Sequence, residues 1–344
     1  MTTALARRAI GSKLRASVSP PLQTLQRARE RLSGHLWTLV PHLKGRLFGR
    51  SGELGRPFAA EVPDERYGSV QVTGRLLEQP PGAEHGRSLY VVLHGLGGSI
   101  DSVYMQRAAL AALAAGADVL LVNQRGAGGS GEDVYHAGLG SDLHAVVANE
   151  ALSGYQSLFI LGHSLGGHIA LSAATGPVDP RVRAVAAVCS PLCLSTSATA
   201  IDLPGRWLYR QHILTALKQS YAAVARRRGL DPHAARGVRT LRGWDERVIA
   251  PRFGFASAED YYAKQSVAPR LADLRVPALY VGARCDPIVP ESTVAAALAP
   301  QHPKLTVRWL ARGGHVGFPA TASLGSSGAL GLEAQVVSWL GAQG

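Results

Sequence analysis

Short apolar runs recur along this chain, separated by segments in which apolar residues have helical spacing. Several runs are almost continuous in Val, Leu, Ile and Ala, which is typical of strands buried on both faces of a parallel sheet. The predicted strands are Ser69–Leu77, Ser88–His94, Asp118–Asn123, Ser157–Leu161, Ala184–Cys189, Pro277–Val281 and Leu305–Leu310. The predicted helices are Val103–Ala115, Leu143–Leu152, Gly166–Ala174, Glu291–Leu298 and Leu332–Leu340. This alternation predicts an α/β fold in which helices flank a mostly parallel sheet.

One long segment interrupts the alternation between two late strands. Residues 191–274 contain no strand-like run and show only helical patterning. Such a segment is too long for a plain loop in a compact domain, so we predict a helical cap over the strand ends. Its aromatic residues fit either ordinary packing within the cap or an apolar pocket for an acyl chain. They are Trp207, Tyr209, Tyr221, Trp244, Phe253, Phe255, Tyr261 and Tyr262.

Ser164 stands between a predicted buried strand and a predicted helix, in the sequence Gly162-His163-Ser164-Leu165-Gly166. This sequence fits the nucleophile-elbow pattern G-x-S-x-G, in which a serine occupies a sharp turn from strand to helix. Glycines on both sides relieve backbone crowding in such a turn. The helix start adds unpaired N–H groups and the positive end of the helix dipole.

Two residues further along the chain are candidates to activate Ser164. A serine hydroxyl needs an imidazole to remove its proton, and the imidazole needs a carboxylate to orient it. Asp286 follows the predicted strand Pro277–Val281, and His315 follows the last predicted strand with glycines at positions 313, 314 and 317. The chain order Ser, Asp, His is that of the hydrolases that use a nucleophile elbow. A turn aspartate before proline is the structural alternative for Asp286.

Two backbone N–H groups are candidates for an oxyanion hole. Leu165 directly follows the serine, and Leu96 lies in the glycine-rich stretch His94-Gly95-Leu96-Gly97-Gly98-Ser99 after a predicted strand. Acyl transfer requires two such donors for the developing negative charge. A phosphate cradle is the alternative for this loop, but it lacks both the P-loop ending and the G-x-G-x-x-G spacing.

Positive charge is concentrated at the N-terminus. The formal net charge is +12 over 344 residues, of which residues 1–50 contribute +9. We therefore expect a basic, partly helical extension over residues 1–50 and a nearly neutral body over residues 51–344. A solvated arm, a transit peptide and a peripheral membrane contact are alternative interpretations of the extension. Nucleic-acid binding is disfavoured because the body is nearly neutral.

The sequence predicts neither a metal nor a cofactor. Its histidines lack paired metal-ligand spacing, and the three cysteines (Cys189, Cys193 and Cys285) form no ligand motif. An odd cysteine count also disfavours a disulfide framework. No apolar run approaches the roughly 20 residues that span a bilayer. We expect a cytoplasmic protein, with peripheral membrane attachment through the extension as an open alternative.

From about Gly34 onward the chain resembles the α/β-hydrolase superfamily, and within it a YheT-like branch that is similar to the eukaryotic ABHD lipases and phospholipases. The elbow and the loop around Leu96 carry the superfamily resemblance. Further stretches carry the branch resemblance; they are residues 34–39, 123–126, 135–138, 244–246, 255, 260–262 and 286–287. Two features depart from the branch: Ala127 follows the Arg-Gly pair where Cys or Ser is usual, and residues 1–33 have no counterpart.

The resemblance implies an α/β-hydrolase fold and hydrolysis of carboxylic esters, with short-chain esters, acylglycerols or phospholipids as candidate substrates. Ser164 would be the nucleophile, His315 the base and Asp286 its partner. Two alternatives stay open on the sequence alone. One is an acyltransferase that uses the same triad, and the other is a non-catalytic protein that docks on membranes.

Overall fold

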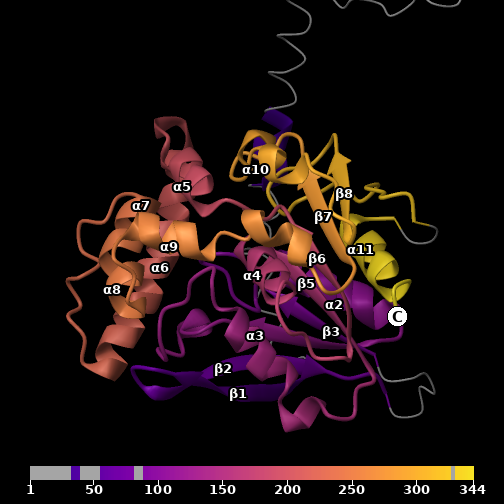
Figure 1. Cartoon of the computed structure of the whole chain (residues 1–344), viewed down its shortest axis with the longest axis horizontal. Coiled ribbons are helices and arrows are strands. Elements are labelled where there is room, and N and C mark those ends of the chain that lie inside the picture. The colour runs from indigo at the N-terminus through magenta and orange to yellow at the C-terminus, as the bar shows by residue number, and fades with distance from the viewer. Residues whose placement is uncertain (1–31, 39–54, 81–87, 327–329) are drawn as a thin grey trace, which may run out of the picture.

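Eight strands form a single sheet. The computed structural model of the chain describes residues 32–38, 55–80, 88–326 and 330–344. The strands are β1 (Arg56–Asp64), β2 (Gly68–Leu77), β3 (Ser88–Leu93), β4 (Asp118–Asn123), β5 (Ser157–His163), β6 (Val182–Val188), β7 (Ala278–Ala283) and β8 (Leu305–Leu310). They are ordered β1-β2-β4-β3-β5-β6-β7-β8 (Figure 1). β2 pairs antiparallel with both β1 and β4, and every other pair is parallel.

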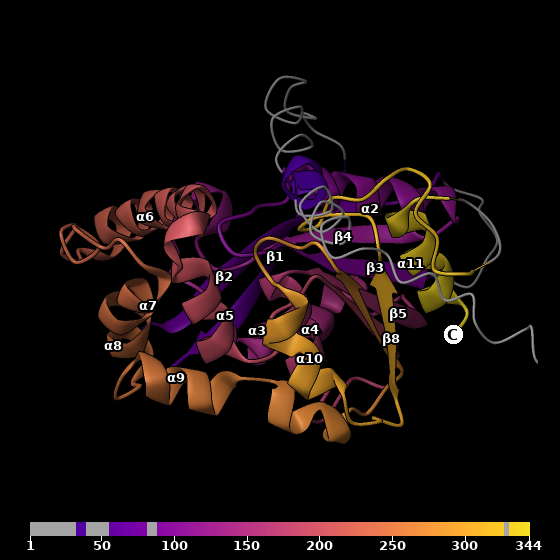
Figure 2. The ribbon, with the colours of Figure 1, turned by 90° about the horizontal axis from the view of Figure 1, so that it is seen from above.

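Helices cover both faces of the sheet, as the turned view shows (Figure 2). They are α2 (Val103–Ala114), α3 (Gly140–Val147), α4 (Leu165–Ala173), α10 (Glu291–Leu298) and α11 (Leu332–Gly341). α3, α4 and α10 contribute to one apolar cluster, whereas α2 and α11 contribute to the cluster on the opposite face.

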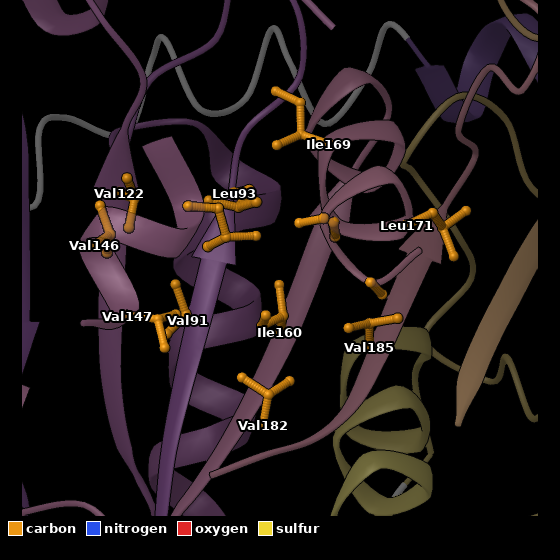
Figure 3. Close-up of a cluster of buried hydrophobic side chains, with 14 of the residues drawn as sticks. Val91, Leu93, Val122, Val146, Val147, Ile160, Ile169, Leu171, Val182 and Val185 are labelled. Atoms are coloured by element: carbon orange, nitrogen blue, oxygen red, sulfur yellow. The ribbon is translucent and has the colours of Figure 1, made fainter. Parts of the chain in front are cut away.

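Alternation along the central strands divides the core between these two faces. Val91 and Leu93 of β3 pack with Ile160 of β5 on the α3 and α4 side (Figure 3). Their neighbours Val92 and Leu161 belong to the opposite cluster. Successive side chains of a strand point to opposite faces, so a strand covered on both faces must be apolar throughout. The core thus fixes the central strands, whose carboxyl ends carry the site.

The segment between β6 and β7 forms a helical cap beside the sheet (Figure 1). Its helices are α5 (Leu194–Asp202), α6 (Trp207–Arg228), α7 (Leu241–Trp244), a π-helical turn (Asp245–Ile249), α8 (Ala250–Phe253) and α9 (Ala258–Gln265), with 3-10 turns at Pro204–Arg206 and Ala268–Asp273. Trp244 and Tyr262 lie in a third apolar cluster, which these helices share. Trp207, by contrast, is 55% exposed.

The α/β-hydrolase fold predicted from the sequence is confirmed, and the predicted strands differ from the observed ones only at their ends. The elements that escaped prediction include the edge strand β1 and the cap helix α5. The predicted helix at Leu143–Leu152 begins earlier, as α3, and its last residues form a 3-10 turn at Glu150–Leu152. Of the N-terminal extension, only residues 32–38 fall within the described part, and they form a helix. No helix in the described part of the chain is both long and apolar enough to cross a bilayer.

A buried ionic network ties the cap to the sheet. Arg125 follows β4 and is 2% exposed; it donates to Asp142 of α3 at 2.6 and 2.7 Å and to Asp64 at the end of β1. Arg252 of the cap helix α8 donates to Asp64 and also to Asp133. Burial raises the pKa of Asp64, but hydrogen bonds from both arginines outweigh it and bring the pKa to about 2. The network therefore connects the end of β1, the segment between β4 and α3, the helix α3 and the cap helix α8.

We expect Arg125→Met to lower the free energy of unfolding by about 3–5 kcal/mol, because it leaves buried carboxylates without their partner. Arg56→Met is the matched control: Arg56 pairs with Glu78 at the surface, where its side chain is 49% exposed. Loss of that exposed pair should cost less than about 1 kcal/mol. Urea unfolding of both variants measures the difference in the free energy of unfolding. Equal losses would contradict a stabilising role for the network.

Candidate active site

Ser164 occupies a strained turn between β5 and α4. Its backbone has φ 52° and ψ −120°, and it directly precedes the first residue of α4. A positive φ is uncommon for a residue with a side chain and costs free energy that the surrounding structure must supply. Here the Ser164 N–H donates to the Val188 carbonyl at 2.8 Å, which fixes the turn against the end of β6. The serine side chain is only partly buried, as a nucleophile requires.

Close backbone packing explains the glycines on both sides of the serine. A Cβ on Gly166 would lie 2.5 Å from the Leu93 carbonyl oxygen, and one on Gly162 would collide with the backbone of Gly166 and Gly167. The start of α4 therefore lies directly against the ends of β3 and β5. Any side chain at either position would push the helix away, and the serine with it.

Asp286 and His315 form a buried hydrogen-bonded pair. His315 Nδ1 lies 2.9 Å from one carboxylate oxygen of Asp286 and 3.2 Å from the other. The backbone N–H groups of Ile288 and Val289 also donate to Asp286, at 2.7 and 2.9 Å. The side chain of Asp286 is 1% exposed and that of His315 is 9% exposed. The carboxylate can thus orient the imidazole and balance a positive charge on it.

Ser164, Asp286 and His315 follow the carboxyl ends of β5, β7 and β8. Ser164 is bonded to Val188, and the Sγ atom of the next residue, Cys189, lies within 4.8 Å of ligand atoms of both Asp286 and His315. No hydrogen bond joins Ser164 to His315 among the described residues. The end of β6, through Val188 and Cys189, therefore lies beside both the serine turn and the Asp286–His315 pair.

The loop after β3 lies directly against the serine. A Cβ on Gly95 would lie 2.9 Å from Ser164 Cβ. The Gly95 and Gly97 N–H groups donate to the hydroxyls of Tyr104 and Tyr135, at 3.1 and 2.7 Å. Within the described ranges, the Leu96 N–H has no acceptor, and the Leu165 N–H is at the open first turn of α4. Leu165 adjoins Ser164 and the loop that contains Leu96 lies against it, so both N–H groups stay candidate oxyanion donors.

His94, in its neutral form, connects this loop to the segment after β4. Its Nε2 accepts from the Gln124 N–H at 3.1 Å, and its Nδ1 donates to the Gly95 carbonyl at 2.8 Å. Complete burial lowers the pKa of His94 to about 4. Burial, together with the nearby His315, lowers the pKa of His163 to about 3. Both histidines are therefore neutral near pH 7.

The cap covers the oxyanion loop. Leu165 belongs to the apolar cluster of the cap, and Leu96 packs against that cluster. A Cβ on Gly97 would lie 3.2 Å from Ala216 Cβ of α6. The surroundings of the two oxyanion donors are therefore largely apolar on the cap side.

Cys189 is a site neighbour that sequence reasoning missed. It follows β6 with φ 52°, is 1% exposed, and its thiol donates to the Gly314 carbonyl at 3.7 Å. Among the described residues, Cys189, Asp286 and His315 place their side-chain ligand atoms within 4.8 Å of one another, close enough to contact one metal ion. Burial raises the pKa of the Cys189 thiol well above its usual value, which opposes the thiolate that metals require. The arrangement suits a carboxylate that orients the His315 imidazole better than it suits metal binding.

Gln124, Tyr104 and Tyr135 were missed as well. Gln124 and Tyr135 each make two hydrogen bonds with the loop after β3, across at least 30 positions of sequence. Tyr104 accepts from the Gly95 N–H, nine positions away. The stretch Asn123-Gln124-Arg125-Gly126 was part of the family resemblance, so it could have marked Gln124 and Arg125. The stretch of residues 135–138, also part of the resemblance, could have marked Tyr135, whereas no motif marks Tyr104.

Comparison with known proteins identifies the family. A sequence profile described as the alpha/beta hydrolase fold matches residues 91–319, and the chain belongs to this family. Within it the chain falls in the YheT/ABHD-like branch. It is 28% identical over 319 residues to the candidate esterase YheT of Escherichia coli (strain K12), covering 89% of each chain. It is 25% identical over 297 residues to phospholipase ABHD3 of Homo sapiens, covering 78% of this chain and 71% of the relative.

The solved structures agree on the fold. The structure of 2,6-dihydroxy-pseudo-oxynicotine hydrolase superposes with a TM-score of 0.51 at 18% identity, covering 82% of this chain and 66% of that chain. At that identity the likeness supports the α/β-hydrolase fold alone.

His94 gives a pH dependence whose sign follows from its lowered pKa. The unfolded state takes up a proton below about pH 6.5, whereas the folded state resists it until about pH 4. This part of the stability is therefore present above pH 6.5 and is lost between pH 6.5 and 4. Between pH 7 and pH 5, the loss from His94 amounts to about 2 kcal/mol.

We expect His94→Gln to remove that part of the pH dependence, because the amide keeps hydrogen-bonding groups but does not titrate. Urea unfolding at pH 7 and pH 5 measures it for the variant and the parent. A variant that loses as much stability as the parent between these two pH values would contradict a neutral, buried His94.

Proposed function

We propose that the protein is a serine hydrolase that cleaves carboxylic esters through Ser164, His315 and Asp286. The observation that supports this most strongly is the pairing of a buried Asp286–His315 hydrogen bond with a partly exposed serine in a strained elbow. Membership of an esterase- and lipase-type branch agrees with it. Together these give a nucleophile, a base and the base's partner at one sheet edge.

In the proposed reaction Ser164 Oγ attacks the ester carbonyl carbon while His315 Nε2 takes the hydroxyl proton. Asp286 stabilises the positive charge on the imidazole. The Leu96 and Leu165 N–H groups stabilise the oxyanion of the tetrahedral intermediate. Collapse of the intermediate transfers the proton from His315 to the leaving alcohol and leaves an acyl group on Ser164. Water, deprotonated by His315, then releases the acid and restores the serine.

The apolar surroundings of the oxyanion donors favour esters with an apolar acyl group. Leu165 and Leu96 pack in the cap cluster, and Ile288, next to the Asp286 turn, packs against the same cluster. Acyl-chain carbons gain free energy in such surroundings. We therefore propose a short-chain or lipid ester as substrate, of the carboxylesterase or acylglycerol-lipase type. A peripheral membrane contact through residues 1–50 stays a prediction, because only residues 32–38 of this segment fall within the described part.

We expect Ser164→Ala to abolish hydrolysis of p-nitrophenyl butyrate, with a fall in kcat of at least about 10³-fold, because the nucleophile is absent. The melting temperature should stay within a few degrees of the parent, since alanine keeps the Cβ that the turn accommodates. Steady-state kinetics and thermal unfolding measure both. A variant with full activity would overturn the proposal.

Acyl transfer to another acceptor is a separate outcome of the same assay. Product analysis with and without an added alcohol distinguishes the two, because a transferase yields mainly the new ester when the acceptor is present. Hydrolysis predicts that the free acid stays the main product in both conditions.

A further inference from the structure

The short helix of residues 32–38 (short indigo helix in Figure 2) precedes the stretch 91–319 that the family profile matches. It nevertheless contacts the loop that carries His315. The His315 N–H donates to Thr38 Oγ1 at 2.8 Å, across 277 positions of sequence. The same hydroxyl donates to the Gly34 carbonyl at 2.8 Å. Thr38 therefore uses one hydroxyl both to accept from the histidine loop and to bond its own helix.

The helix packs against the loop that carries Asp286 and the loop that carries His315. A Cβ on Gly34 would collide with the carbonyl oxygen of Cys285, the residue before Asp286. A Cβ on Gly314, the residue before His315, would collide with Gly34 and Thr38. Such contact is possible only because Gly34 and Gly314 lack side chains.

The helix also touches the cap. The His35 ring stacks on Tyr209 of α6 with centroids 5.6 Å apart, and its Nδ1 is hydrogen-bonded to the tyrosine hydroxyl. One seven-residue segment thus contacts the aspartate loop, the histidine loop and the cap. Each of these elements comes from a different part of the chain.

The histidine loop, residues 313–317, has a strained backbone and is hydrogen-bonded from two sides. Val316 has φ 53°, and the loop is stabilised internally by the Gly314 N–H donating to Gly317 O at 2.8 Å. Outside the loop, the Cys189 thiol bonds the Gly314 carbonyl from the sheet side. Thr38 bonds the adjacent His315 N–H from the other side. The peptide bond between Gly314 and His315 is thereby held at both its carbonyl and its N–H group.

We propose that residues 32–38 form a clasp, and that Thr38 is a positioning residue which sets the imidazole of His315 for proton transfer. This role rests on the proposed serine-hydrolase function. It requires the hydroxyl itself, because only the oxygen accepts from His315. Small displacements of a base cost rate through misalignment and leave ground-state binding largely unchanged.

The decisive comparison is Thr38→Val against Thr38→Ser. Valine keeps the shape but removes the hydroxyl, whereas serine keeps the hydroxyl and removes a methyl group. For p-nitrophenyl butyrate we expect Thr38→Val to lower kcat on the order of tenfold, with KM within about twofold of the parent. Thr38→Ser should retain kcat within about threefold. Leu36→Ala, at a position 56% exposed on the same helix, is the control and should match the parent.

Two results would overturn the clasp. One is parental kcat in Thr38→Val, and the other is an equal loss in Thr38→Ser and Thr38→Val, which would show that shape and not the hydroxyl matters. If Thr38→Val does not fold, Thr38→Ala replaces it under the same criteria, because alanine introduces no bulk and favours helix.

Ser164→Ala, measured in the same series, separates failure of the clasp from failure of the function. If Ser164→Ala is inactive and Thr38→Val is unimpaired, only the clasp fails. If Ser164→Ala stays active, the proposed function fails, and the clasp, which rests on it, fails too.

Discussion

The candidate site depends on a buried carboxylate, that of Asp286, which is hydrogen-bonded to the imidazole of His315. Burial of an ionised carboxylate is costly unless hydrogen bonds replace the lost water. Hydrogen bonds to Asp286 from described residues come from the N–H groups of Ile288 and Val289 and from His315 Nδ1. The two backbone donors belong to its own turn, so they hold the carboxylate independently of the loop that carries His315. The proposed function depends on this pair.

Much of this arrangement could be read from local sequence. Strands β3 to β7 are near-continuous apolar runs because both faces are covered, and the elbow at Ser164 carries glycines because the backbones touch there. Asp286 and His315 were found from their places after late strands. In each case the physical cause acts within a few residues, so the sequence pattern records it.

The features that escaped prediction arise from other causes. β1 contains Pro57 and Pro63, and prolines together with an edge position weaken the strand signal. α5 is rich in small and hydroxyl residues, so it lacks a clear apolar stripe. Contacts such as Thr38 with His315 join segments far apart in the chain, and no local pattern records a partner of that kind.

Under the proposed function, the sheet and the helical cap have different roles. Ser164, Asp286 and His315, which follow the carboxyl ends of sheet strands, would supply the chemistry. The cap, whose apolar cluster includes Leu165, would contact the acyl group. The ionic network around Arg125 connects these two parts, since it joins α3 and the end of β1 to the cap helix α8.

The most direct measurement is reaction of the full chain with a fluorophosphonate probe, followed by mass mapping of the modified peptide. The probe reacts with serines that are activated by a neighbouring base. The account predicts one adduct, on Ser164, and a labelling rate that falls on the order of 10²-fold or more in Asp286→Asn, because the imidazole loses its oriented, basic form. Absence of labelling, or an adduct on a different serine, would contradict it.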